Sequence, residues 1–435
     1  MADEPKKIGL ITSTSYVVGG MIGAGIFVIP AVLAPYGSIS FLGWIFTAIG
    51  ALILARIFGN FSKILVNISG GPYTYSRAGF GDFIGFLVAW GYWISIWVSN
   101  AALAITIVGT LSFFFPIIND DPILRVLVGL SFIWLFTWIN TKGIKESGKV
   151  QVITTVLKLL PLFFVIIVGL FLFDINNFPS FNLTSKSDFE VFPIVAAITL
   201  YAFLGIESAS IPAAYIKNPE KTVSKATLLG TVIVTCVYIL STFVLFGVLP
   251  MDELAASPSP FADAGRLIGG DFGGYFVAGG IAISAIGCLN GWILFSGQIP
   301  MAASKDKLFP KIFGKENKNG APVMSLIIGS ILTSGIMLMN LSDGLVEQFD
   351  FIAGIVVFSN LIPYLFVAAA YILVLIDKKI YVNNWIKTML LGLLGIAYSL
   401  WAIYGSGNDT VFYGFLLLIC GIPMYVVMKW NRRKE

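Results

Sequence analysis

Two long hydrophobic segments of this chain are interrupted in their middles by runs of small residues. The first run is Gly19-Gly20-Met21-Ile22-Gly23-Ala24-Gly25, and the second is Phe203-Leu204-Gly205-Ile206-Glu207-Ser208-Ala209-Ser210. Inside a bilayer, a broken helix exposes peptide N–H and C=O groups, which is tolerated only where they line a protein cavity or hold a solute. Two such breaks, in matching halves of one chain, predict a binding site between them.

The composition supports a membrane setting for these segments. Of the 435 residues, 57% are hydrophobic and 11% are charged, whereas a soluble domain carries about 25% charged residues. Many apolar runs exceed the roughly 20 residues that a helix needs to cross a bilayer. An outer-membrane barrel would show short alternating segments instead. The fold class predicted is therefore an all-α polytopic membrane protein.

The apolar runs predict twelve transmembrane helices, with the first and sixth broken. We expect a single transmembrane domain over 1–435, in which 10–173 is a first five-helix repeat, 192–375 is a second, inverted repeat, and 386–430 adds two helices. The predicted spans are 10–34, 41–66, 83–114, 123–140, 150–173, 192–216, 226–248, 273–303, 321–340, 345–375, 386–405 and 410–430.

The distribution of cations predicts the topology. Most lysines and arginines fall on the set of loops that also contains both termini, whereas the opposite loops hold only Arg125, Lys186 and Arg266. Positively charged loops stay on the cytoplasmic side. We therefore expect a multi-pass protein of a bacterial-type inner (plasma) membrane, with both termini cytoplasmic.

The residues that catalysis and metal binding usually need are scarce. The chain has no histidine, and its three cysteines, Cys236, Cys288 and Cys420, all fall inside predicted spans. This disfavours histidine-based acid–base chemistry and the commonest metal ligands. The net charge of +4 is spread over short loops, which is not a nucleic-acid signal. We predict no enzyme activity, no metal, no cofactor and no nucleic-acid partner.

The first break suits an anion. Its glycines let the backbone leave helical geometry at low cost, and a helix that starts after Gly25 directs free N–H groups and a positive dipole end into the cavity. Such a site would hold a carboxylate. The alternative is close packing of two helices through small residues.

The second break contains an acidic side chain at mid-membrane depth. Burial of the Glu207 carboxylate carries a large desolvation cost, which favours its protonated form. Glu207 could carry a proton or balance a cationic solute, or it could anchor the unwound backbone of a neighbouring helix. Lys158, in the fifth predicted span, could snorkel to the interface or brace the broken first helix as a bound cation would.

Aromatic and amide side chains surround the two breaks. Tyr92 lies on the third predicted span with Asn100, Tyr201 precedes the second break, and Trp292 follows Gly291. Aromatic faces attract cations and also form thin gates. Each ring taken singly is more often a packing residue, so it is the combination that favours a cation site.

Five segments carry a resemblance to a known family: Gly23-Ala24-Gly25-Ile26-Phe27, Gly70-Gly71-Pro72-Tyr73-Thr74-Tyr75, Gly205-Ile206-Glu207-Ser208-Ala209-Ser210, Lys217-Asn218-Pro219-Glu220 and Gly291-Trp292. Across nearly its whole length the chain resembles the amino acid–polyamine–organocation superfamily, and within it the bacterial basic amino-acid/polyamine antiporters of the arginine/agmatine type. The resemblance implies a LeuT-type 5+5 inverted repeat, alternating access and a homodimer.

The resemblance also implies roles for individual residues. The amides of Ala24 and Gly25 would hold the substrate carboxylate, and the carbonyls of Met21, Tyr201 and Leu204 would accept from its α-amino group. The positions implied for the distal cationic group are Asn100, Leu103, Trp292 and Val356; those for gates are Tyr92, Tyr201, Trp292 and Tyr364; those for proton coupling are Glu207, Tyr73 and Lys158.

Several of these positions differ from the arginine exchanger. Tyr201 replaces a tryptophan, Val356 and Ala24 replace serines, and Lys158 resembles the lysine that replaces sodium in proton-coupled symporters of the superfamily. From the buried carboxylate, the aromatic rings and the two helix breaks, we predict secondary transport of an amino acid, cationic by preference, in exchange for a related amine or amino acid. The alternative is proton-coupled symport of broader specificity.

Overall fold

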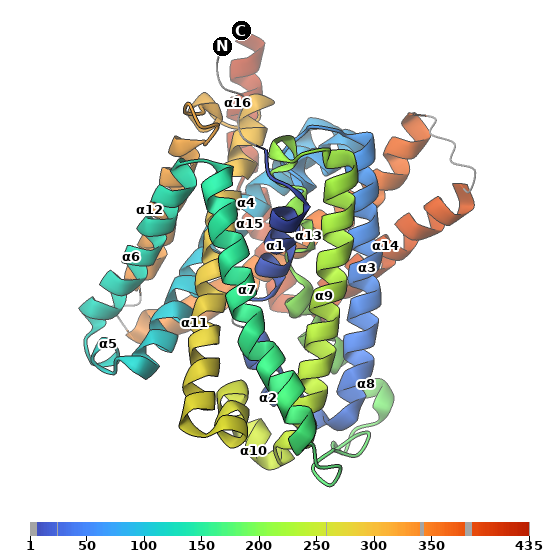
Figure 1. Ribbon diagram of the computed structural model, residues 1–435. Helices are drawn as coiled ribbons and strands as arrows, with labels where there is room; N and C mark the ends of the chain where they lie inside the picture. The colour runs from blue at the N-terminus through green and yellow to red at the C-terminus, as the bar shows by residue number, and fades with distance from the viewer. Residues whose placement is uncertain (1–6, 24, 258, 340–342, 379–384, 435) are drawn as a thin grey trace.

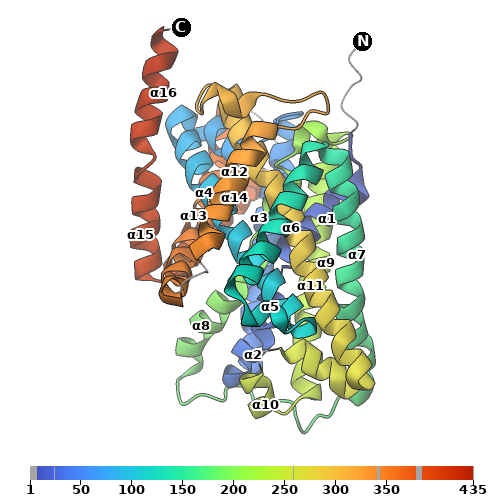
Figure 2. The same ribbon diagram turned by 90° about the vertical axis from the view of Figure 1, so that its left-hand side faces the viewer.

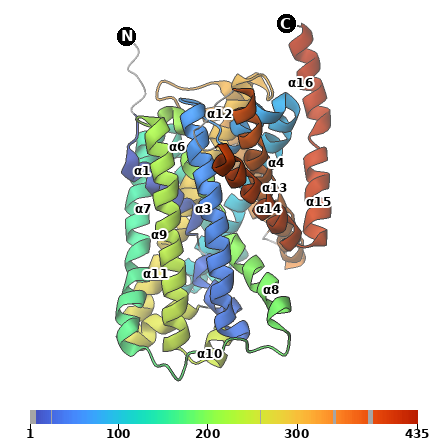
Figure 3. The same ribbon diagram turned by 90° about the vertical axis from the view of Figure 1, so that its right-hand side faces the viewer.

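The protein is a bundle of long helices that run between two ends of the molecule (Figure 1). The computed structural model describes residues 7–434 except 24, 258, 340–342 and 379–384. Its regular elements are all helices, and outside them Ile8 and Ile216 form an isolated parallel backbone pair. The start of α1 (Leu10–Met21) and the end of α16 (Ile422–Lys434) lie at the same end of the bundle (Figures 2 and 3). We call this end the terminal end.

The other α-helices follow in chain order. They are α2 (Ile29–Leu33), α3 (Ser40–Ile64), α4 (Pro72–Phe114), α5 (Ile117–Asp120), α6 (Pro122–Thr141), α7 (Ile144–Gly169), α8 (Asp188–Leu200), α9 (Pro219–Val248), α10 (Met251–Ala256), α11 (Pro260–Lys305), α12 (Val323–Met339), α13 (Asp343–Asp377), α14 (Trp385–Gly405) and α15 (Asn408–Ile419). Short 3-10 turns connect several of them.

The helices are long and apolar enough for a polytopic membrane protein. Within the described ranges, ten helical stretches have the length and hydropathy to cross a bilayer, and Val323–Leu338 is a shorter apolar helix. Most of these stretches bury only part of their apolar surface inside the protein, so the rest is available to lipid. The predicted count of twelve and the inverted repeat stay predictions.

Several helices begin earlier than the hydrophobic runs predict. α4 starts at Pro72 rather than at residue 83, and α11 starts at Pro260 rather than at residue 273. In each case a short helical segment is joined to the apolar part across a glycine with positive φ, Gly81 (φ 78°) or Gly270 (φ 62°). These segments contain charged residues, so hydropathy alone does not extend the span through them.

Both predicted breaks are present. α1 ends at Met21, and the chain passes through a 3-10 turn at Gly25–Phe27 before α2 begins at Ile29. α8 ends at Leu200 and is followed by 3-10 turns rather than by an α-helix through residue 216. Gly205 permits the second break, because its φ of 103° is a left-handed conformation that side chains disfavour.

The two breaks lie against each other. A Cβ atom placed on Gly205 would lie 3.0 Å from both the carbonyl carbon and the oxygen of Gly20. A Cβ atom on Gly20 would in turn lie 2.5 Å from Oγ of Ser208. The absence of side chains at these two glycines therefore allows the interrupted segments to meet backbone to backbone.

We predict that Gly205→Ala destabilises the protein by about 1–3 kcal/mol, because the new Cβ occupies a strained backbone conformation and approaches the backbone of Gly20. The measurement is thermal unfolding of the purified protein in detergent. Gly279→Ala is the matched control, since a Cβ at Gly279 of α11 has no atom within 4 Å. Equal melting temperatures for the two variants would contradict the prediction.

Candidate functional site

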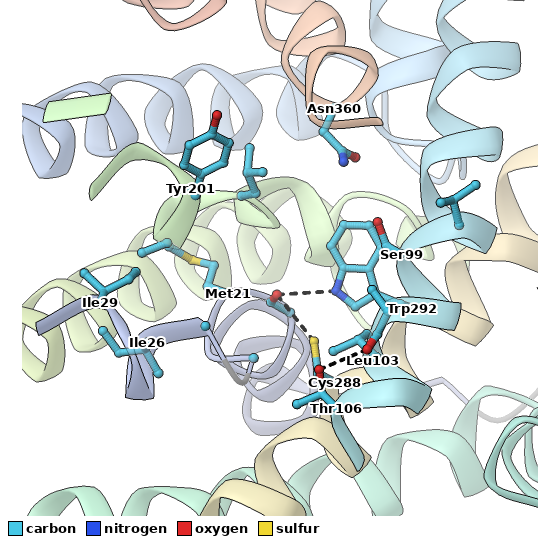
Figure 4. Close-up of a pocket in the computed structure, with 17 residues that line it drawn as sticks. Met21, Ile26, Ile29, Ser99, Leu103, Thr106, Tyr201, Cys288, Trp292 and Asn360 are labelled. Atoms are coloured by element: carbon cyan, nitrogen blue, oxygen red, sulfur yellow. Dashed lines mark hydrogen bonds between the residues drawn. The ribbon is translucent and has the colours of Figure 1, made fainter. Parts of the chain in front are cut away.

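A cavity of about 390 Å³ lies between the two breaks and the facing sides of α4, α11 and α13 (Figure 4). Its size falls in the range of about 300–1,000 Å³ that small-molecule sites occupy. Its lining combines backbone of both breaks, aromatic rings and a few polar side chains. The lining residues are Gly20, Met21, Gly23, Gly25, Ile26, Ile29, Val98, Ser99, Ala102, Leu103, Thr106, Tyr201, Ala202, Leu204, Cys288, Trp292 and Asn360.

The carbonyl groups of the first break are held by a buried cation. Nζ of Lys158 donates to the carbonyl oxygen of Ile22 at 2.6 Å and to that of Gly19 at 3.3 Å. It also donates to the carbonyl oxygen of Ser284 at 3.3 Å. The hydroxyl of Ser284 donates to the same Ile22 oxygen and, at 2.9 Å, to the oxygen of Gly23. Lys158 is fully buried, so these bonds replace the water that the ammonium group has lost.

A tyrosine from α9 connects the two breaks. The hydroxyl of Tyr238 lies 2.9 Å from the carbonyl oxygen of Met21 and 3.0 Å from that of Ala202. From α11, Nε1 of Trp292 donates to the carbonyl oxygen of Gly20 at 3.3 Å, a bond drawn in Figure 4. Orphaned carbonyls of both breaks thus have partners from helices outside them.

Glu207 lies in the second break, and two tyrosine hydroxyls donate hydrogen bonds to its carboxylate. Its side chain is 1% exposed. Tyr92 of α4 donates to Oε1, and Tyr364 of α13 donates to Oε2 at 2.6 Å. The hydroxyl of Tyr364 also accepts from the amide of Gly205 at 3.1 Å. The carboxylate therefore joins the second break to α4 and α13.

The cavity wall carries no charged side chain among the described residues. None of the described lining residues is Asp, Glu, Lys or Arg. Around the cavity, Tyr201 and Trp292 supply aromatic surface, and Figure 4 shows Ser99 and Asn360 on the side away from the first break. The cavity can bind through peptide groups, hydroxyls, an amide and rings. Among the described residues, no group of three or more His, Cys, Asp or Glu could hold a metal ion.

The structure gathers some of the predicted site residues at this cavity and places others around it. Lys158 braces the first break, Glu207 bonds to Tyr92 and Tyr364, and these four side chains are not in the lining. Ala24 and the side chain of Val356 lie outside the described residues. The predicted residues that line the cavity are Met21, Gly25, Leu103, Tyr201, Leu204 and Trp292.

Two predicted residues have other surroundings. Asn100 is 1% exposed, is not in the lining, and its Oδ1 has no hydrogen-bond partner in the described part of the chain. Tyr73 lies at the start of α4 and donates to Oδ2 of Asp306 at 2.7 Å, beside the ion pair of Asp306 with Arg77. Its hydroxyl therefore belongs to a network at the terminal end rather than to the bonds of Glu207.

Sequence reasoning missed several residues of the site. Ser99 and Thr106 share a face of α4 with the predicted Leu103, so helical spacing of three to four residues could have found them. Asn360 lies one turn from the predicted Tyr364, which is the same kind of signal. Tyr238 and Ser284 carry no such signal, because their role depends on which distant helices meet at the breaks.

Comparison with known proteins gives one family and a consistent set of relatives. The family model described as "Amino acid permease" matches residues 8–427. The chain is 32% identical to a putative arginine/ornithine antiporter of Bacillus subtilis, covering 100% of this chain and 99% of the relative. It is 33% identical to an arginine/agmatine antiporter of Chlamydia pneumoniae (97% and 90%) and 31% identical to a cadaverine/lysine antiporter of Escherichia coli (99% and 96%).

We predict that Lys158→Met lowers stability by on the order of 3 kcal/mol, because the carbonyls that Lys158 binds would stay buried without a donor. Thermal unfolding of the purified protein measures the loss. Lys149→Met is the matched control on the same helix, since Lys149 is exposed and pairs with Glu146 on the surface. The prediction fails if the two variants unfold at the same temperature.

Proposed function

The chain belongs to the amino acid permease family, and we propose that it is a secondary active transporter that exchanges a cationic amino acid for a related amine or amino acid by alternating access. One observation carries the proposal: a small-molecule cavity lies between two helix breaks whose peptide groups face it. The antiporter relatives support exchange as the mode of transport. The family is one of transporters, not of enzymes.

The substrate backbone binds at the breaks. The positive end of the helical segment that starts at Gly25 holds the carboxylate, together with the amide of Ala24. The carbonyls of Met21, Tyr201 and Leu204 accept from the α-amino group. This arrangement is supported by the position of Gly25, Met21, Tyr201 and Leu204 on the cavity wall.

The distal cation of the substrate lies among rings and amides. The faces of Trp292 and Tyr201 attract it, and Leu103 packs against its aliphatic stem. Asn360, which lines the cavity, joins Asn100 and Val356 as a residue that selects among side chains. Because no lining residue is acidic among those described, recognition depends on these neutral groups and tolerates more than one amine.

Rings and the buried carboxylate separate the cavity from the terminal end. Tyr201 is 40% exposed, whereas Tyr92 and Glu207 are each 1% exposed. We infer a state that is open away from the terminal end and closed toward it, with the exposed Tyr201 on the open side. Tyr92 and Tyr364 form the closed gate, and Tyr201 and Trp292 form the other gate. Glu207, Tyr73 and Lys158 couple protons to the conformational change between the two states.

The membrane arrangement completes the proposal. The chain crosses a bacterial-type inner membrane twelve times, with residues 10–173 and 192–375 as inverted repeats of the LeuT type and 386–430 as two added helices. The terminal end is cytoplasmic, as the excess of lysine and arginine on its loops supports, and the protein is a homodimer.

We predict that the purified protein in proteoliposomes loaded with arginine takes up labelled arginine, ornithine or lysine, and that empty vesicles do not. Exchange depends on internal substrate because each half of the cycle returns a loaded carrier. The measurement is counter-flow with a competition panel of cationic and neutral amino acids and their amines. If no cationic amino acid or amine exchanges, the assignment of substrate class is wrong.

The same experiment tests the alternative mode. Proton-coupled symport would be supported by uptake into empty vesicles under a pH gradient, without internal substrate. Lys158 gives this alternative a specific basis, since its ammonium group holds the first break where a coupling ion would bind. Uptake of that kind would overturn exchange as the mode.

We predict that Glu207→Gln removes most of the dependence of exchange on pH between about pH 5 and about pH 8, because the amide keeps hydrogen-bonding groups near Tyr92 and Tyr364 but cannot take up a proton. The measurement is the initial rate of exchange at each pH, with melting temperature as a check of folding. Glu253→Gln, at an exposed acid of α10, is the control. An unchanged pH profile in Glu207→Gln would remove the coupling role.

A further inference from the structure

Two groups of packed elements meet at the terminal end. The first group contains residues 206–217, the segment after the second break, which we call the second arm. Its first turn, Ile206–Ala209, packs against α1, α3 and α9. The second group contains α4, α6, α11 and α12, in which α11 packs against the other three helices. Glu207 of the second arm is bonded to Tyr92 of α4, so access from the terminal end requires the two groups to separate.

The second arm is joined to the start of the chain by a pair of backbone hydrogen bonds. The amide of Ile8 donates to the carbonyl oxygen of Tyr215 at 2.9 Å, and the amide of Lys217 donates to the carbonyl oxygen of Ile8 at 2.9 Å. Ile8 directly precedes α1, which ends at the first break. The pair therefore links the terminal-side segments of both breaks, so that one contact to the second group can hold the two together.

The loop between α11 and α12, residues 306–322, is fixed to the second group. Nδ2 of Asn317 donates to the carbonyl oxygen of Thr141, the last residue of α6, at 2.7 Å. Oγ of Ser325 in α12 donates to the carbonyl oxygen of Phe313 at 2.7 Å. Because the loop is bonded to α6 and α12 as well as joined to α11, it belongs to the second group.

A side-chain hydrogen bond connects the second arm to this loop. The hydroxyl of Tyr215, a residue that is 8% exposed, donates to Oε1 of Glu316. Nζ of Lys305, the last residue of α11, donates to the same oxygen at 2.8 Å. Lys305 and Glu316 both belong to the second group, so their ion pair holds the carboxylate in position. The bond from Tyr215 instead joins the two groups.

We propose that the hydrogen bond between Tyr215 and Glu316 is a latch that holds the transporter closed at the terminal end. When that end opens, the hydroxyl leaves the carboxylate, and the backbone pair with Ile8 lets α1 and the second arm move together. A hydroxyl bonds to a carboxylate more strongly than to a neutral acceptor. Neither Tyr215 nor Glu316 lines the cavity, so both act on access as positioning residues. The proposal rests on alternating access in the proposed function, but not on which solute is transported.

The test uses Cys288, which lines the cavity (Figure 4), as a reporter of access. The parent for the test is the full chain with Cys236→Ala and Cys420→Ala, in which Cys288 is the single cysteine. A small charged methanethiosulfonate that does not cross the membrane is added to sealed vesicles of either orientation. The rate at which it modifies Cys288 from each side measures how often the cavity opens to that side.

Three variants of this parent are compared. Tyr215→Phe removes the donor of the latch, and Glu316→Ala removes its acceptor. Tyr425→Phe is the matched control, because it removes a hydroxyl from a ring of α16 that packs against Phe83 of α4. Melting temperature verifies that each variant folds.

We expect Cys288 of the Tyr215→Phe variant to react about tenfold faster from the terminal side than in the parent, and no faster from the opposite side. Glu316→Ala should shift in the same direction, and Tyr425→Phe should match the parent on both sides. An unchanged rate from the terminal side in Tyr215→Phe overturns the latch. A rise from both sides also overturns it, because that result indicates a general loosening of the bundle.

This result is separate from that of the counter-flow assay, because the modification of Cys288 needs no solute. If counter-flow succeeds and Tyr215→Phe reacts as the parent does, the latch alone is wrong. If the rate from the terminal side rises as expected and counter-flow fails, the latch is supported and the assigned substrate class is wrong.

Discussion

The architecture of this transporter depends on how peptide groups are satisfied where two helices break in the middle of the bundle. A carbonyl group without a hydrogen-bond donor at that depth cannot bond to bulk water, and its burial costs several kcal/mol of free energy. Here Lys158, Ser284, Tyr238 and Trp292 donate to carbonyls of the breaks. These donors come from α7, α9 and α11, so the breaks persist only because the surrounding bundle supplies partners.

Because one of these donors is a cation, the two sides of the cavity differ in electrostatic potential. Lys158 is a buried cation that donates to the carbonyl oxygens of Gly19, Ile22 and Ser284, and it forms no ion pair with a carboxylate among the described residues. Its charge adds to the positive end of the helical segment after Gly25. The opposite side of the cavity has Tyr201, Asn360 and Ser99 instead. The two sides of the cavity therefore differ: a buried cation lies behind one side, and a ring, an amide and a hydroxyl face it from the other.

Sequence reasoning could predict the breaks and, as one of two alternatives, the bracing of the first break by Lys158, but not the other partners of the breaks. The runs of glycine and small residues around Gly23 and Gly205 indicate where a helix can fail, since this depends on local backbone freedom. The early starts of α4 and α11 could not be predicted from hydropathy. The helical turns before Gly81 and Gly270 contain charged residues, and charged segments are typical of loops. The roles of Tyr238 and Ser284 could not be predicted, because they arise from contacts between helices that are far apart in the sequence.

α4 carries contacts of three kinds along one axis, and this constrains how the cavity can change its access. Its second half lines the cavity from Val98 to Thr106. Nearer its start, Tyr92 bonds to Glu207, and at the start Tyr73 and Arg77 bond to Asp306.

If α4 moves as a rigid body, opening toward the terminal end must break both sets of bonds together. Gly81, with its positive φ, lies between the apolar part of α4 and the ion pairs of its first turns. A bend at Gly81 would separate the bonds of Glu207 from the contact of Arg77 with Asp306, but it would also strain the ion pair between Arg77 and Asp82, which spans this glycine.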